Sequence, residues 1–218
     1  MIFISYSHKD DKAAGKLNRE LEAAYYSTFL AHDDVVPTAD WHVEIWAALK
    51  DCHAFVGLLT ENFTGSAFCQ QEVGAALALG KPHVLAVDGA KHRPPGFAAR
   101  FQTVRRDELL ETLNKSPTFR EARVEAWIEA NRKAHTYEEA NLIHRRFWQE
   151  WENMKTRERL RWLIAGAKNS QVRDEGFTAG PFFKRALREL KPRLTNEWLA
   201  ENDPDQDVRR VLRKLDDE

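Results

Sequence analysis

Short apolar runs alternate with stretches of helical periodicity through the first half of the chain, and this alternation constrains the fold more than any other feature. Runs of apolar, β-branched and aromatic residues predict strands at 2–6, 27–31, 54–59, 83–87 and 101–104. Apolar residues at helical spacing predict helices at 12–25, 41–52 and 66–79, with a short helix from Arg106. Strands that alternate with helices form parallel sheets covered on both faces. We therefore expect an α/β, flavodoxin-like fold with five parallel strands in the order 2-1-3-4-5.

The second half of the chain has helical periodicity but no convincing strand. Apolar residues recur at helical spacing over 137–154, 157–167 and 182–194. Five of the seven tryptophans follow residue 115, and the apolar stripe that they join predicts the core of a separate helical domain. The Ser-Pro dipeptide at 116–117 marks a break between the halves. We expect two domains, 1–115 and 116–218.

Charge and cysteine content argue against several classes of protein. The formal net charge is −1. Residues 1–115 include 12 basic and 15 acidic side chains, and residues 116–218 include 21 basic and 19 acidic ones. Neither half therefore has the basic surplus of a nucleic-acid-binding domain. Cys52 and Cys69 fit neither a disulfide framework nor a metal-ligand spacing, and we expect both to be small buried apolar residues. No signal peptide is recognisable, and no apolar run approaches the roughly 18–20 residues that a membrane span needs. These features predict a cytoplasmic protein that binds no nucleic acid, membrane or metal.

The predicted topology places a ligand site at one edge of the sheet. In open parallel sheets, ligands bind outside the carboxyl ends of the strands, at the point where the strand order reverses. In the order 2-1-3-4-5 that point lies between the first and third strands, so the loops 7–11 and 60–65 should face each other. The next helix, 66–79, carries Glu72 on a row of small and apolar side chains. Glu72 is therefore the first candidate for a functional carboxylate.

Proteins that handle phosphate or nucleotides on this topology carry motifs that are missing here. Strand 54–59 is followed by Thr60, so the phosphoacceptor aspartate of a receiver domain is absent. The chain contains no G-x-G-x-x-G dinucleotide motif and no G-x-S-x-G nucleophile elbow. The Gly-Lys pair at 80–81 lacks the upstream glycine of a P-loop. The side chains that remain near the expected site belong to Ser, Tyr, His, Asp, Phe and the helix-borne Glu72.

Three segments of the first half resemble signature segments of Toll/interleukin-1 receptor (TIR) domains. IFISYSHKD, at 2–10, resembles the first box of that family. SAFCQQEVGAALALGKPHVLAV, at 66–87, resembles the segment with the pattern Ser-x-Trp-Cys-x-x-Glu, and LAHDDVVPTADWHVEI, at 30–45, resembles the second-strand loop of bacterial members. Because the order and the spacing of all three agree, the resemblance covers about residues 1–115.

The resemblance implies an activity and a set of site residues. Many bacterial members cleave the nicotinamide–ribose bond of NAD+, sometimes with cyclisation of the product, and their catalytic glutamate stands at the position of Glu72. Phe68 stands where the family more often has tryptophan, which keeps a ring but removes an indole donor. NAD+ would be the substrate, and no metal is implied. The residues that would line its site are Ser5, Tyr6, Ser7, Asp33, Trp41, Ser66 and Phe68.

Each of these assignments has a structural alternative. A glutamate at a helix edge is usually a solvated surface residue, Ser66 is most simply an N-cap, and Phe68 and Trp41 could belong to the core. Other family members are adaptors without enzymatic activity, which act through TIR–TIR self-association, here through the 32–41 loop and its neighbouring helices. Enzymes of the family in bacterial antiphage defence act alone or with an effector that senses their nucleotide product. In either case, residues 116–218 could dock on the first half and control oligomerisation or access to the site.

Overall fold

The computed structural model describes residues 1–31, 41–88, 94, 96–100 and 103–216. The chain forms two compact units, Met1–Glu125 and Ala126–Glu218. The division falls inside the helix Arg120–Lys133, later than the boundary predicted after residue 115. The independent folding of residues 1–115 stays a prediction.

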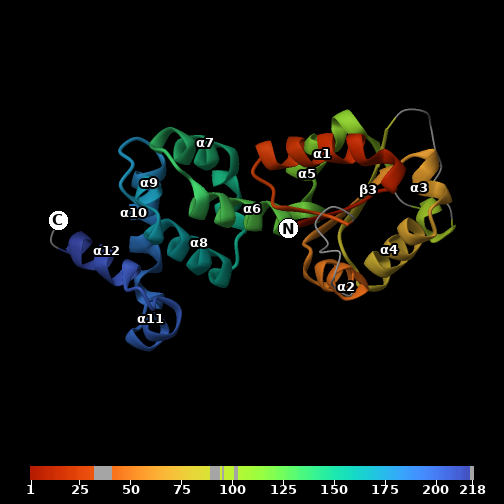
Figure 1. The fold of residues 1–218 in the computed structure, drawn as a ribbon. Helices are drawn as coiled ribbons and strands as arrows, with labels where there is room; N and C mark the ends of the chain where they lie inside the picture. Colours follow the sequence, from red (N-terminus) through yellow and green to blue (C-terminus); the bar gives the residue numbers. More distant parts are fainter. Residues whose placement is uncertain (32–40, 89–93, 95, 101–102, 217–218) are drawn as a thin grey trace. The chain divides into compact units, whose positions relative to one another are not determined.

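A five-stranded parallel sheet forms the centre of the first unit, in the order β2-β1-β3-β4-β5 (Figure 1). In its register, Ser5 of β1 lies opposite Gly57 of β3. The predicted flavodoxin-like sheet is thereby confirmed, and two of its strands have the predicted bounds. The strands are β1 Ile2–Ser5, β2 Thr28–Leu30, β3 Ala54–Leu59, β4 His83–Val87 and β5 Thr103–Arg105.

Helices cover both faces of this sheet. Figure 1 shows α1 and α5 on one face, with α2 and α4 on the other. The helices are α1 Asp11–Ala23, α2 Trp41–Asp51, α3 Glu61–Gly65, α4 Ala67–Ala78 and α5 Leu109–Lys115. Short 3-10 turns occupy His8–Asp10, Gly96–Arg100, Arg106–Glu108 and Pro117–Phe119.

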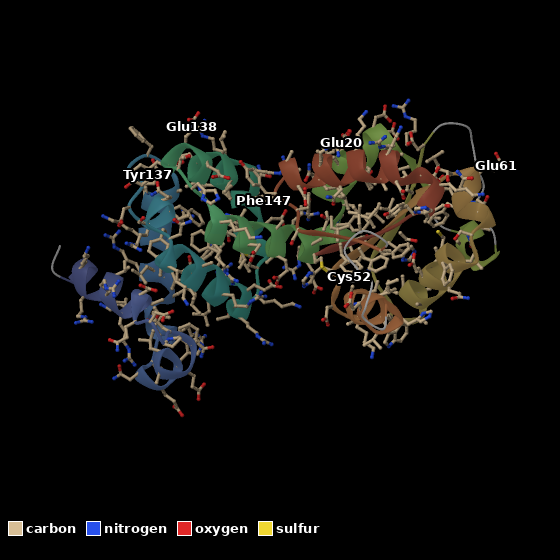
Figure 2. The ribbon with its side chains drawn as sticks, viewed as in Figure 1. Glu20, Cys52, Glu61, Tyr137, Glu138 and Phe147 are labelled. Carbon is tan, nitrogen blue, oxygen red and sulfur yellow. The ribbon has the colours of Figure 1, made fainter. Side chains whose placement is uncertain are left out.

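The core on the α2 and α4 side decides where the candidate site can form. Alternate strand residues face it, among them Phe3 and Phe55, because successive side chains of a strand point to opposite faces. Gly57 lies on this face, where an added Cβ would lie 2.5 Å from a methyl carbon of Leu85, so a larger residue would require the Leu85 side chain to move. Cys52 and Cys69 are both buried in the same core, which confirms the prediction made for them; Figure 2 labels Cys52.

Two segments of the first unit differ from their predictions. The expected loop 60–65 is largely the short helix α3, because Thr60 Oγ1 accepts a hydrogen bond from the Phe63 amide at 3.0 Å and the Phe63 ring is buried. The strand predicted at 101–104 is described from Thr103 onwards.

The second unit is built from helices, in agreement with the prediction of a C-terminal helical region. The helix predicted over 137–154 ends as an α-helix at Phe147 and continues as the 3-10 turn Trp148–Asn153. Trp127 and Trp162 are buried with their ring centroids 5.1 Å apart, so the tryptophan-rich stripe forms a core as expected. Among the described residues, no helix is long and apolar enough to cross a membrane. The helices are α6 Arg120–Lys133, α7 Tyr137–Phe147, α8 Thr156–Lys168, α9 Ser170–Arg173, α10 Ala179–Leu190, α11 Asn196–Asn202 and α12 Asp207–Asp216.

Candidate functional site

Helix α4 carries Glu72 into the protein interior. The helix begins after Ser66, whose Oγ accepts a hydrogen bond from the amide of Cys69 at 3.3 Å, so the predicted N-cap is confirmed. It is followed by Gly80, whose φ of +63° suits a helix end. Cys69, Glu72 and Ala76 recur at helical spacing and all face inwards. Only 5% of Glu72 is exposed, so the alternative of a solvated surface residue is wrong.

A serine of the sheet holds the Glu72 carboxylate. Ser5 is the last residue of β1 and has no exposed surface, and its Oγ donates a hydrogen bond to Glu72 Oε2 at 2.5 Å. The other oxygen, Oε1, accepts no hydrogen bond from the residues that the structure describes. The two carboxylate oxygens are therefore inequivalent: within the described part of the chain, one is hydrogen-bonded to the sheet and the other has no hydrogen bond.

Burial decides the protonation of Glu72. It raises the pKa of this carboxyl from 4.5 to about 7, and the hydrogen bond from Ser5 opposes part of that rise. The positive end of the helix dipole acts mainly within the first turn, and Glu72 lies in the second, so it offers little compensation. Glu72 consequently gains and loses its proton near neutral pH.

A cavity of about 330 Å³ opens beside Glu72, between α2 and α4. This volume lies within the range of small-molecule pockets, which is about 300–1,000 Å³. Phe68 on α4 and Trp46 on α2 each contribute a partly exposed ring, 44% and 43% exposed. The cavity therefore combines aromatic surface with one buried carboxyl. Its lining consists of His42, Ile45, Trp46, Leu49, Phe68, Gln71, Glu72 and Ala75.

Three other predicted site residues that the structure describes are not part of this cavity lining. Tyr6 is fully buried and Ser7 is 8% exposed, and neither belongs to the lining. Ser66 caps α4 without lining the cavity. Asp33 lies outside the described residues, and Trp41 begins α2 but its side chain also lies outside the description.

The two loops predicted to face each other are joined by side chains. Asp10 follows β1, and its carboxylate accepts hydrogen bonds from Thr60 Oγ1 at 2.5 Å and from Asn62 Nδ2 at 2.8 Å. Thr60 and Asn62 follow β3. This contact ties together the carboxyl ends of the two central strands, where the strand order reverses.

Sequence reasoning missed three polar or aromatic residues of the lining, His42, Trp46 and Gln71. The sequence did contain a signal for Trp46. It follows Ile45 directly and so lies outside the apolar stripe that packs its helix on the sheet, and a tryptophan in that position is not explained by core packing. His42 and Gln71 carried no such signal. Within the described ranges, no group of three His, Cys, Asp or Glu side chains is arranged to hold a metal ion.

Comparison with protein families matches residues 2–115 to the model of the TIR domain. The match covers more than half of the 218 residues and includes the whole sheet, the cavity lining and Glu72. No match was found among curated proteins or among solved structures.

Proposed function

Because the chain belongs to the TIR domain family, we propose that it is an NAD+ glycohydrolase, with Glu72 as its catalytic residue. One observation carries the proposal: a buried carboxyl, alone on an apolar helix face, borders a cavity that also contains the ring of Phe68. Burying a carboxylate is unfavourable, and folding alone gives no reason to place one there. Perturbed carboxyl groups in clefts are candidates for functional groups.

The chemistry of the nicotinamide–ribose bond suits a single carboxylate. The bond breaks with its electron pair moving to the pyridinium nitrogen, so nicotinamide leaves as a neutral molecule and needs no general acid. Positive charge develops on the ribose, as in the oxocarbenium-like transition state of glycoside hydrolysis. Ionised Glu72 would stabilise that charge. Water then adds to the ribosyl carbon and loses a proton, and in cyclisation a nucleophile of the same nucleotide replaces the water.

The remaining lining residues would bind and orient the substrate. The rings of Phe68 and Trp46 are accessible to a planar aromatic group, and a cationic pyridinium ring would be attracted to their faces. Gln71 offers an amide to polar groups of the substrate. Ser5, by contrast, directs its hydroxyl to Glu72.

The family resemblance extends the proposal to a biological setting. We propose a cytoplasmic enzyme of bacterial antiphage defence, which self-associates through its TIR domain and produces a nucleotide signal for an effector protein. Residues 116–218 would control that assembly or access to the site. These proposals rest on the family resemblance.

Product analysis tests the enzymatic proposal. Purified protein is incubated with NAD+ at dilute and at crowded concentrations, and the products are separated by chromatography with mass detection. We expect nicotinamide and an ADP-ribose product from the wild type and from Glu61→Ala, which alters an exposed glutamate on α3. Glu72→Ala should release none. Normal release by a correctly folded Glu72→Ala protein would remove Glu72 from the mechanism.

Exposed apolar side chains favour one second candidate, an adaptor without enzymatic activity. Val43, Trp46 and Phe68 are 61%, 43% and 44% exposed on α2 and α4, and exposed apolar clusters often mark protein interfaces. An adaptor would lose self-association or partner binding in a Val43→Ser or Trp46→Ser variant while NAD+ stays intact under every condition. Analytical ultracentrifugation beside the product analysis separates the two candidates.

A further inference from the structure

Ser5 occupies a place in β1 where an apolar side chain would be expected. Phe3, two residues earlier on the strand, packs into the core between the sheet, α2 and α4. Because strand side chains alternate between faces, Ser5 points to the same side. Ser5 is fully buried, and burying a hydroxyl without a partner is unfavourable.

The partner of this hydroxyl is the only negatively charged group of the buried face of α4. Ser5 Oγ and Glu72 Oε2 are 2.5 Å apart, and the two residues are separated by 67 positions in the chain. The pair is therefore made by tertiary packing of α4 on the sheet. Each residue supplies the hydrogen-bond partner for a buried polar atom of the other.

The hydrogen bond also sets the orientation of the carboxylate. A glutamate side chain has three rotatable bonds, and an unrestrained carboxylate could exchange its two oxygens. Oε2 is held at the end of β1, Oε1 has no hydrogen bond among the described residues, and Glu72 borders the cavity. Catalytic groups act best when supporting hydrogen bonds hold them in place before the substrate binds.

We propose that Ser5 is the positioning residue of Glu72: its buried hydroxyl holds Oε2 and leaves Oε1 as the oxygen presented to the substrate. This inference rests on the proposed function of Glu72. It gives Ser5 a role behind the catalytic group, in place of the substrate-lining role predicted from the sequence.

The other titratable groups around Glu72 do not replace this contact. Cys69, one turn earlier on α4, has its thiol pKa raised to about 11, chiefly by burial, and its thiol also makes a hydrogen bond with the Ser5 side chain. The thiol is neutral at physiological pH, so it adds no charge beside Glu72. His42 of α2 lines the same cavity, so a pH profile of activity would not report on Glu72 alone. The test must therefore observe the Glu72 carboxyl itself.

A carbon-13 NMR titration of the full chain, labelled in its glutamate carboxyls, observes that group. The Glu72 signal is assigned by its loss in Glu72→Gln. In Ser5→Ala, we expect Glu72 to titrate about one to two pH units higher than in the wild type, because a hydrogen bond to a charged group is lost. Ser5→Cys keeps a similar volume with a weaker donor, so its titration should lie in between.

Thr28→Val is the matched control. Thr28 on β2 also donates a 2.5 Å hydrogen bond, to Asn18 Oδ1, and it does not line the cavity. This variant should leave the Glu72 titration unchanged. An unchanged Glu72 titration in Ser5→Ala would overturn the inference, and Ser5→Cys decides the question if the alanine variant does not fold.

Kinetics give the second readout. In Ser5→Ala, the acidic limb of the pH profile of kcat should move upwards with the Glu72 titration, so that activity lost at pH 7 returns towards pH 9, with KM little changed. A purely structural role for Ser5 would lower activity equally at every pH. If the wild type never cleaves NAD+, the proposed function fails, while the NMR titration still decides whether Ser5 controls Glu72.

Discussion

Replacing Glu72 by glutamine should make the protein more stable at alkaline pH. Glutamine keeps the shape of the side chain, and its amide oxygen can accept the hydrogen bond that Ser5 now donates to the carboxylate. The substitution removes a negative charge from a residue that is only 5% exposed. The gain in stability therefore measures how strongly the folded protein disfavours the negative charge of Glu72.

The size and the sign of this gain follow from the pKa of Glu72. The pKa is about 7 in the folded protein against 4.5 for an unperturbed glutamate, a difference of about 2.5 units. At about 1.36 kcal/mol per unit, this corresponds to about 3 kcal/mol. Because the folded-state pKa is raised, the stabilising contribution of protonated Glu72 is fully present below pH 4.5 and is lost as the pH rises through about 7. The advantage of Glu72→Gln should thus grow by about 3 kcal/mol between pH 4 and pH 8.

Urea unfolding at pH 4, 6 and 8 measures the difference between the two proteins, and amide hydrogen exchange of β3 reports on the first unit separately. Glu61→Gln serves as the control, because Glu61 projects away from α3 into solvent (Figure 2) and its substitution also removes one carboxylate. A difference between Glu72→Gln and wild type that stays constant from pH 4 to pH 8 would refute the reasoning. The stabilised variant should also release no nicotinamide.

Three further perturbations have equally definite outcomes. Gly180→Ala should destabilise the helical unit by about 3 kcal/mol or more in urea unfolding, because the new Cβ would lie 1.9 Å from the carbonyl oxygen of Glu175. Gly176→Ala is the control: its new Cβ meets no atom within 4 Å, so the free energy of unfolding should change little. His144→Phe should make the helical unit less sensitive to acid. Burial, aided by a neighbouring arginine, lowers the pKa of His144 from 6.5 to about 4, so the wild-type protein loses stability as the pH falls from 6.5 towards 4. Acid unfolding followed by tryptophan fluorescence measures the difference between the two proteins. Phe68→Ala should raise KM for NAD+ about tenfold in steady-state assays with little loss of stability, and Phe68→Trp should retain activity.

The sequence was sufficient for the sheet because its strands are continuous apolar runs between turn residues. β3 and β4 have the predicted bounds. A strand buried on both faces is a nearly continuous apolar run, so polar residues mark where it begins and ends. The short helix α3 was missed, because its formation depends on burial of Phe63 against distant residues of the core. In the second half of the chain, periodicity indicated α7, α8 and α10, whereas α6 and α12 were not predicted. The four-residue helix α9 is too short to produce a periodic signal.

The candidate site divides in the same way. The resemblance of the segment from Ser66 to Glu72 to the family motif pointed to Glu72 as the catalytic candidate. The local sequence also predicted the Ser66 N-cap, because capping depends on neighbours within a few residues. Trp46 joined the site only through the packing of α2 beside α4, which no local pattern specifies.

The charge of Glu72 was likewise beyond local reasoning. From the sequence, the helix N-terminus favours the ionised carboxylate and the apolar neighbours oppose it, and these opposing effects have no predictable balance. Burial in the folded unit decides the balance, and the Ser5 hydroxyl, 67 residues away, moderates it. The sequence by itself determined the fold class and pointed to Glu72 as the candidate for the chemistry, because the first follows from short-range patterns and the second from the resemblance of a local segment to the family motif. The protonation, the orientation and the cavity of that residue were decided by tertiary structure, because desolvation and hydrogen bonding depend on atoms that only folding brings together.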